Sequence, residues 1–167
     1  MFKFKTYVLK RMNMPFTIVF VRDSFDEILV DVLNQIVNEI DKYLQNVEEK
    51  FSPFLSESLV SRHTDLGEEL QDDFFDIEYQ EVYSRSIIAK KETHGLFDPF
   101  FDGKYNPTGF VKGWAIENAF MKYIKPLIDN NILEAGAING AGDMQVGTRL
   151  DSNFSWKIGI ENPEDKE

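Results

Sequence analysis

Residues 93–117 read THGLFDPFFDGKYNPTGFVKGWAIE, and this stretch decides how the rest of the chain is expected to fold. Three glycines and two prolines precede Lys112 in it, so no helical or strand pattern persists there and a shaped loop is predicted. An amphipathic pattern begins at Lys112 and predicts a helix. The amides of residues 109–112 would then lie at a helix N-terminus, where unpaired N–H groups and the helix dipole favour an anion such as phosphate. An ordinary connecting loop is the alternative interpretation of this spacing.

Upstream of this stretch, the sequence predicts one strand and two helices. Residues 16–21, FTIVFV, are β-branched or aromatic, which is typical of a buried strand. The segment SFDE at 24–27 has capping-box spacing, and apolar residues then recur every three or four positions up to Val47, which indicates a long packing helix. An exposed acidic turn at 65–76 is expected to lead into a further helix over residues 78–92.

Downstream, the chain changes character. Pro126 is expected to kink or end the helix that starts at Lys112. Small residues at 135–142 indicate a place where a ligand or another backbone comes close, or else a tight turn between strands. Two short strands are predicted at 144–147 and 156–160. Helices that alternate with strands predict an α+β layered fold, with a mixed or antiparallel sheet packed by about three helices.

Length, charge and composition exclude several classes of protein. The 167 residues suit one domain covering 1–167, and 43% hydrophobic content indicates a globular chain. A formal net charge of −11 argues against nucleic acid and anionic membranes as partners. The chain contains no cysteine, so a disulfide framework or a thiolate metal site is excluded. Without an apolar leader or a run of about 20 apolar residues, membrane insertion is not expected and a cytoplasmic location is predicted.

A second candidate region for ligand contact lies at residues 51–63, where serines and Pro53 predict a loop. Phe54 offers a ring that can stack on a ligand, and anchoring the loop is the alternative role. The two histidines, His63 and His94, lack the spacing of a local metal site. We therefore interpret both as loop residues without a catalytic role.

Six segments in chain order resemble sequence boxes of one family, the ApbE family of FAD:protein FMN transferases. The segments are Met14–Pro15; Phe51–Phe54 with Ser58, Ser61 and Arg62; Gly95–Pro99; Tyr105–Ala115; Asn139–Asp143; and Trp156–Pro163. The resemblance covers nearly the whole chain but only the N-terminal half, or somewhat more, of a family member. It therefore implies an ApbE-like layered fold in a truncated version.

The resemblance also implies a set of ligand-binding residues. FAD would be held by Met14, Phe54, Leu96, Phe97, Asp98, Asn106 and Lys112. The main-chain carbonyl of Gly109 matches a position that helps to coordinate Mg²⁺ in the family, and carbonyl oxygen suits this hard cation. Asn106 stands where the family has aspartate, which removes one negative charge beside the expected phosphate site. The resemblance assigns no catalytic base.

The activity that the resemblance implies is Mg²⁺-dependent transfer of FMN from FAD to a threonine of an acceptor protein, with release of AMP. The boxes that supply the family's metal carboxylate and hydroxyl ligands have no counterpart in these 167 residues. Whether the isolated chain is an active enzyme therefore stays open. A separate chain carrying the C-terminal half, or a homo-oligomer, would complete the site. The alternative function is a catalytically inactive flavin-binding module, or an interaction and oligomerisation module.

Overall fold

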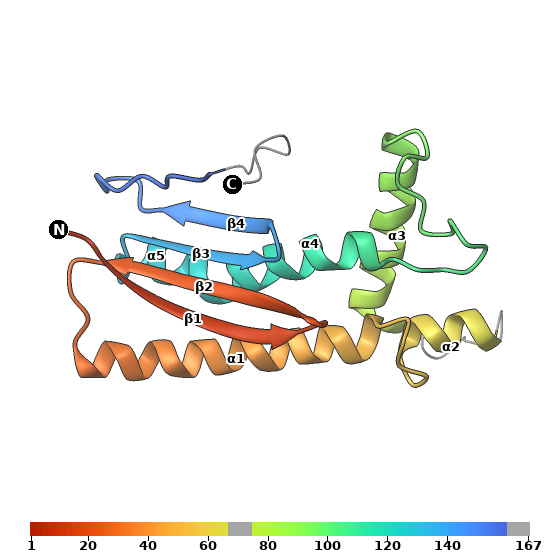
Figure 1. Ribbon diagram of the computed structural model, residues 1–167, viewed down its shortest axis with the longest axis horizontal. Helices are drawn as coiled ribbons and strands as arrows, with labels where there is room; N and C mark the ends of the chain where they lie inside the picture. Colours follow the sequence, from red (N-terminus) through yellow and green to blue (C-terminus); the bar gives the residue numbers. More distant parts are fainter. Residues whose placement is uncertain (67–74, 160–167) are drawn as a thin grey trace, which may run out of the picture.

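The computed structural model describes residues 1–66 and 75–159 (Figure 1). Within these residues four strands form one antiparallel sheet in the order β1-β2-β3-β4. The strands are β1 (Lys3–Arg11), β2 (Met14–Arg22), β3 (Ala135–Gly140) and β4 (Asp143–Thr148). The helices are α1 (Glu27–Phe51), α2 (Leu59–Leu66), α3 (Ile77–Glu92), α4 (Thr108–Ala119) and α5 (Lys125–Asp129), with a π-helical turn at Phe120–Ile124 between α4 and α5. The α+β layered architecture predicted from the sequence is confirmed, and the sheet is purely antiparallel.

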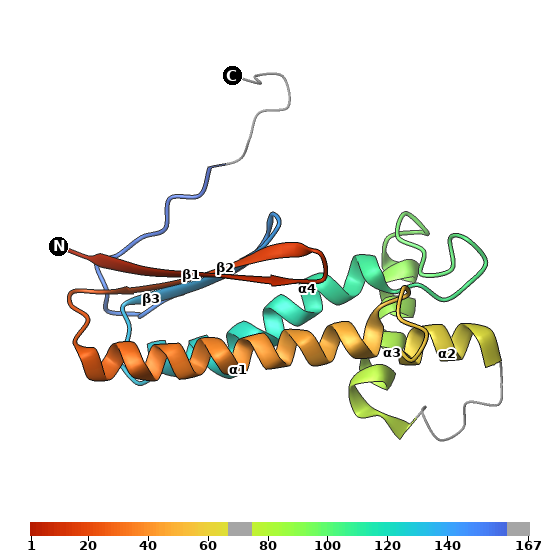
Figure 2. The same cartoon turned by 60° about the horizontal axis from the view of Figure 1, so that its bottom comes forward.

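The two faces of the sheet differ because side chains alternate along each strand. Phe16, Ile18 and Phe20 on β2 are fully buried, and Ile18 is the cross-strand partner of the equally buried Ile138 on β3. This face is covered by α1, α4 and α5 (Figure 2). The predicted strand at 16–21 is therefore the central part of β2, and its alternate residues form the core side of the sheet.

Helix α1 is the long packing helix that the periodicity predicted. It begins two residues later than the capping-box pattern suggested, because the N-cap is Asp26 and not Ser24, and the side chain of Asp26 accepts a hydrogen bond from the amide of Leu29 at 2.8 Å. The helix runs for 25 residues along the sheet and buries one stripe of side chains. Leu33, Ile40 and Leu44 in this stripe are completely buried. Burial of this stripe, more than helix propensity, holds the helix in place.

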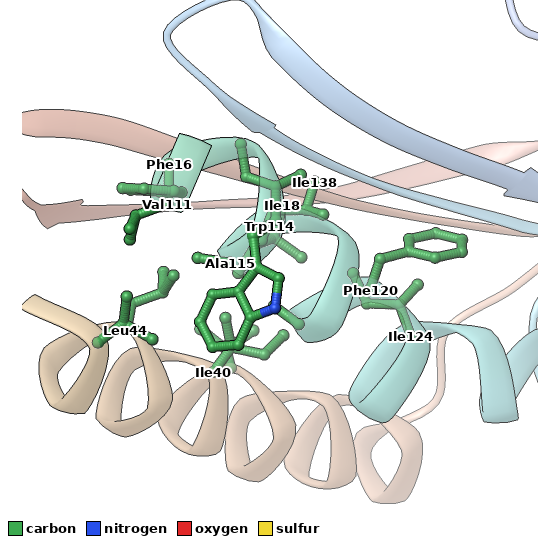
Figure 3. Close-up of a cluster of buried hydrophobic side chains, with 14 of the residues drawn as sticks. Phe16, Ile18, Ile40, Leu44, Val111, Trp114, Ala115, Phe120, Ile124 and Ile138 are labelled. Carbon is green, nitrogen blue, oxygen red and sulfur yellow. The ribbon is translucent and has the colours of Figure 1, made fainter. Parts of the chain in front are cut away.

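Trp114 on α4 joins the helices to the sheet in the centre of the core (Figure 3). Its side chain is 4% exposed and lies between Ile40 and Leu44 on α1 and Ile18 and Ile138 on the sheet. Its indole N–H donates a hydrogen bond to Glu81 of α3 at 3.1 Å. The side chain of Trp114 thus connects the sheet, α1 and α3, and the core fixes the position of α4.

Helix α4 begins at Thr108, four residues before the start that we predicted at Lys112. The loop before the helix folds back so that the ring of Phe97 lies against Gly109 in the first turn of α4. The α-helical pattern gives way to the π-helical turn directly before Pro126, which lies in the first turn of α5. This matches the expected effect of a proline, which lacks the N–H that a continuous helix needs.

Further parts of the structure differ from the sequence predictions or were not predicted. Residues Lys3–Arg11 form β1, a strand that was not predicted. The expected loop at 51–63 is shorter, because α1 extends to Phe51 and α2 begins at Leu59. Residues 156–159 form no strand, and Ile160 lies outside the described residues. Most of the expected acidic turn at 65–76 also lies outside them.

The extended segment after β4 lies on the sheet face opposite the helices (Figure 2). Phe154 makes edge contacts with the rings of Phe2 and Phe4, and Trp156 donates a hydrogen bond to the carbonyl of Gly147 at 3.2 Å. The side chains of Phe154 and Trp156 thus attach this segment to β1 and β4. In the part of the chain that the structure describes, no helix is long and apolar enough to cross a membrane.

Candidate functional site

Two hairpin turns lie at the same end of the sheet. Residues Arg11 and Met14 pair across the first turn, and Gly140 and Asp143 pair across the second. Both turns contain two residues in the left-handed region, with φ of 51° and 57° at Met12 and Asn13 and of 49° and 103° at Ala141 and Gly142. Such two-residue turns match the twist of antiparallel strands. The glycine-rich segment 135–142 is therefore a strand followed by a tight turn, which was one of the two interpretations of the sequence.

A cavity of about 360 Å³ opens beside these turns. Its wall is formed by the β1–β2 turn, the last turns of α1, the loop after α1, the first turns of α4, and Asp143. The volume lies at the lower end of the range for small-molecule sites, roughly 300–1,000 Å³. A cavity built from four separate segments of the chain is a candidate binding site.

One side of the cavity is apolar and suited to a flat ring. Met14, Val47, Phe51 and Val111 contribute aliphatic, thioether and aromatic surface, and Val47, Phe51 and Val111 are almost completely buried. Phe54 also lines the cavity, but its side chain is 87% exposed. An exposed aromatic ring at a cavity rim is free to stack on a ligand. Phe54 thus lies at the rim of the cavity, and its contact with a ligand stays a prediction.

Three charged side chains line the cavity. The ammonium of Lys112 lies 2.8 Å from a carboxylate oxygen of Asp143 and forms an ion pair with it. Glu48, near the end of α1, adds a second carboxylate. The wall thus carries one positive and two negative groups, and a bound phosphate would have to compete with Asp143 for the only ammonium in this wall.

The structure brings together four of the eight residues that the resemblance named. Met14, Phe54, Gly109 and Lys112 all line the cavity, although they come from β2, the loop after α1, and α4. Two segments of the wall were not predicted as part of the site, and these are Met12–Asn13 in the β1–β2 turn and Val47–Glu48 near the end of α1. Met12 and Asn13 were missed because the strand β1 before them was missed, and a hairpin prediction over residues 3–22 would have found them.

The other four named residues lie in the loop between α3 and α4 and do not line the cavity. Leu96 is 95% exposed. Phe97 packs beside Gly109, so it supports the cavity wall from behind. Asp98 pairs with Lys90 at 2.8 Å, and the hydrogen bond from Lys90 lowers the pKa of Asp98.

Asn106 has a local structural role at the start of α4. Its side-chain oxygen accepts hydrogen bonds from the amide of Thr108 at 3.2 Å and from the hydroxyl of Thr108 at 2.5 Å. Among the amides of residues 109–112 that we expected to bind an anion, those of Phe110 and Val111 are already occupied, because both donate to the carbonyl of Pro107, at 2.8 and 2.9 Å. The remaining positive group at this end of α4 is the Lys112 ammonium.

The described residues do not fit a magnesium site. Gly109 is the second residue of α4, so its carbonyl oxygen points along the helix toward the amide four residues on. Asp143 is held by Lys112. Among residues 1–63, 75–159 no group of three histidine, cysteine or acidic side chains is placed to hold a metal ion. A cation there would need ligands from outside this part of the chain.

A cluster of aromatic rings lies under the α3–α4 loop, away from the cavity. His63 on α2 hydrogen-bonds to the hydroxyl of Tyr79 at 2.5 Å and stacks on Tyr83, and Tyr105 packs on the same rings. Burial lowers the pKa of His63 and raises the pKa of Tyr105 to about 12. The prediction that His63 is a loop residue is therefore wrong, because it lies in α2 and packs in this aromatic cluster.

No protein-family model matches the sequence, and a search of curated proteins finds no match. Solved structures are nevertheless similar in fold. The flavin transferase ApbE from Vibrio cholerae has a TM-score of 0.70 over 98% of this chain, at 13% sequence identity. An ApbE protein from Thermotoga maritima has a TM-score of 0.72 over 99% of the chain, at 15% identity. The apo form of flavinyl transferase ApbE from Pseudomonas stutzeri has a TM-score of 0.69 over 95%, at 15% identity.

These similarities confirm the ApbE-like fold that the six sequence boxes predicted. The chain spans 65% of the length of each of the three structures. It therefore corresponds to part of the ApbE fold, in agreement with the N-terminal portion that the order of the boxes predicted. At 13–15% identity the similarity establishes the fold, and the ligand and activity are matters for proposal.

Proposed function

We propose that this chain binds the flavin nucleotide FAD, with an aromatic ring of the ligand in the cavity beside the hairpin turns. The observation that carries the proposal is that Met14, Phe54, Gly109 and Lys112, four residues named by the resemblance, meet in one cavity. The fold is shared with proteins described as flavin transferases. A cavity of about 360 Å³ accommodates a ring system and leaves the rest of a dinucleotide to extend beyond it.

The residues of the wall would divide the binding between apolar and charged contacts. Phe54 stacks on the ring, while Met14 provides polarisable surface that adapts to its edge. Lys112 provides positive charge for a phosphate oxygen. Leu96, Phe97, Asp98 and Asn106 belong to a loop outside the cavity, so direct contact with the ligand requires the ligand to extend over that loop. Phe97 and Asn106 would otherwise act by holding α4 in place.

The reaction implied for an ApbE-like protein is transfer of FMN to a threonine hydroxyl of an acceptor protein. The threonine oxygen would form a bond to the FMN phosphorus, the bond from this phosphorus to the AMP oxygen would break, and AMP would leave. The threonine proton would pass to a base, and no residue of the cavity is assigned this role. Lys112 would contribute by attracting phosphate charge.

Mg²⁺ dependence of this transfer would require metal ligands beyond those in residues 1–63 and 75–159. A second chain that carries such ligands would satisfy this need, and a threonine-bearing acceptor protein would be the further partner. The second candidate function is a flavin-binding module without transfer activity. One observation favours this second function. The carboxylate of Asp143 in the cavity wall is neutralised by its ion pair with Lys112.

The test of the proposed function is a titration of FAD with the protein, followed by flavin fluorescence. Wild-type protein should show saturable binding. Lys112→Met removes one charge-assisted contact and should weaken binding roughly tenfold or more. Lys42→Met is the matched control, because Lys42 forms an ion pair with Glu39 on the exposed side of α1 at 2.8 Å, away from the cavity. Its affinity should equal that of the wild type.

Two results would contradict the proposal. One is the absence of saturable FAD binding by the wild-type protein. The other is equal binding by the Lys112 and Lys42 variants, which would place the ligand elsewhere. If FAD binds, a transfer assay with Mg²⁺ and a threonine-bearing acceptor separates the transferase from the silent module, since only the transferase releases AMP.

A further inference from the structure

The ion pair of Lys112 and Asp143 connects the helical layer to the sheet at the cavity. Its two side chains are 27% and 53% exposed, so the pair lies at the open side of the cavity and is in contact with solvent. An ion pair in such a position is weak, because water screens its charges. Lys112 can therefore exchange one anionic partner for another at little cost.

The two members of the pair differ in the length and flexibility of their side chains. Asp143 is the first residue of β4 and is the ladder partner of Gly140. The turn between Gly140 and Asp143 is held by a hydrogen bond from the amide of Gly142 to the side-chain oxygen of Asn139 at 2.9 Å. Lys112 carries its charge at the end of a long, flexible side chain. In an exchange, the ammonium of Lys112 moves and the carboxylate of Asp143 stays in place.

We infer that Asp143 is a built-in competitor that holds Lys112 until a phosphate-bearing ligand takes the ammonium over. The inference rests on the proposed function of the cavity and adds a specificity-determining residue to it. Once Lys112 turns to a phosphate, Asp143 and Glu48 are left as two carboxylates in the wall of the same cavity. Asp143 thus lowers the affinity for anionic ligands in two ways, by occupying Lys112 and by repelling the phosphate. It has no such effect on an uncharged ligand of the same shape.

The test compares FMN with riboflavin, which share the flavin ring and ribityl chain and differ by one phosphate. Their affinities are measured by flavin fluorescence at low salt for the wild type and for Asp143→Asn, which keeps the shape of the side chain and removes its charge. The variant should bind FMN about three- to fivefold more tightly, as expected for release of a partly exposed ion pair. Its affinity for riboflavin should change less than twofold. Added salt should reduce the gain for FMN.

Asp129→Asn is the matched control. Asp129 pairs with Lys125 at 2.6 Å, its side chain is 56% exposed, and it lies on α5 outside the cavity. This variant changes the net charge by the same amount and should leave both affinities unaltered. Asp143→Ser is a second variant that removes the charge without introducing the amide group of Asp143→Asn, which can make new contacts. A thermal melt of each variant checks that it is folded.

The inference is overturned if Asp143→Asn and Asp143→Ser weaken FMN binding, because Asp143 would then position Lys112 for the ligand. It is also overturned if FMN and riboflavin change by the same factor, or if neither changes. In these cases flavin binding itself still stands. If wild type and variants bind neither flavin, the proposed function fails and the inference fails with it.

Discussion

Gly140 on β3 lies directly against the ring of Phe16, its cross-strand partner on β2. A Cβ atom at Gly140 would lie 2.8 Å from Cε1 of Phe16 and 2.9 Å from Cδ1 of Ile116 on α4. Glycine at this position therefore allows α4 to approach the sheet beside the cavity. The same holds for Gly147 on β4, where a Cβ would lie 2.7 Å from the ring of Phe120.

Gly140→Ala should destabilise the protein, because the added methyl group has to displace an aromatic ring or a helix in a packed core. Overpacking of this kind costs about 1–3 kcal/mol. Gly113→Ala on α4 is the matched control, since nothing lies within 4 Å of the position of its Cβ. It should stabilise the helix by up to about 1 kcal/mol. Urea unfolding of both variants measures the difference, and equal stabilities would contradict the packing that the structure shows.

These glycines also show what the sequence could predict and what it could not. The run at 135–142 indicated close approach of a backbone or a ligand, or a tight turn. The close approach is that of helix side chains on one face of the sheet, and this depends on packing between segments far apart in the chain. Local patterns predicted α1, α3 and β2 well, because each buries one periodic stripe.

The candidate site was predictable only in part, for a physical reason. The resemblance named residues in four segments, but their distances depend on how the hairpin turns sit against α4. Strand β1 was missed because lysines and Arg11 interrupt its apolar residues, so no continuous apolar run marks this edge strand. Without β1 the Met12–Asn13 turn could not be placed at the cavity. The loop residues Leu96 and Asp98 were named by sequence order alone, and order does not determine side-chain direction.

Lys50 links the end of α1 to the start of α3, and breaking this link should lower stability. Its ammonium pairs with Asp76 at 2.8 Å and with Glu78 at 2.5 Å. Asp76 also caps α3 by accepting from the amide of Tyr79 at 2.8 Å. Asp76→Ala removes both the helix cap and the ion pair with Lys50, and should lower the free energy of unfolding by about 0.5–2 kcal/mol. Asp76→Asn keeps the capping oxygen and should lower the stability by less than Asp76→Ala. Urea unfolding measures both variants, and an equal loss of stability in the two would mean that the cap contributes nothing.

The same link predicts a pH dependence at the acidic end. Burial would raise the pKa of Asp76, but the hydrogen bonds from Lys50 and from the amide of Tyr79 outweigh it, so its pKa lies below the usual 3.8. The stabilisation is therefore fully present above about pH 4 and is lost as the pH falls through the folded-state pKa. Lys50→Met should reduce the loss of stability that accompanies a fall in pH below about 4. If the stability of this variant falls with pH as steeply as that of the wild type, the ion pair is not the cause of the pH dependence.

His63 should make stability depend on pH in a higher window. Burial lowers its pKa from the ordinary value of 6.5, so the folded state favours the neutral ring that bonds to Tyr79 and stacks on Tyr83. The stabilisation is complete above about pH 6.5 and declines as the pH falls toward the lower folded-state pKa. His63→Phe keeps a ring and should remove this slope. His94→Asn, which retains a residue that tolerates the left-handed backbone at φ 52°, should keep it.

Phe54 and Leu96 distinguish a ligand confined to the cavity from one that extends over the α3–α4 loop. Both side chains are exposed apolar groups, 87% and 95% exposed, but only Phe54 lines the cavity. Phe54→Ala should weaken flavin binding roughly threefold to tenfold, as loss of one aromatic stacking contact predicts. Leu96→Ala should leave the affinity within twofold of the wild type, since this side chain lies outside the wall. Fluorescence titration with riboflavin measures both, because the phosphate plays no part in this comparison. A larger loss for the Leu96 variant would show that the flavin ring lies on the loop and that the cavity serves another part of the ligand.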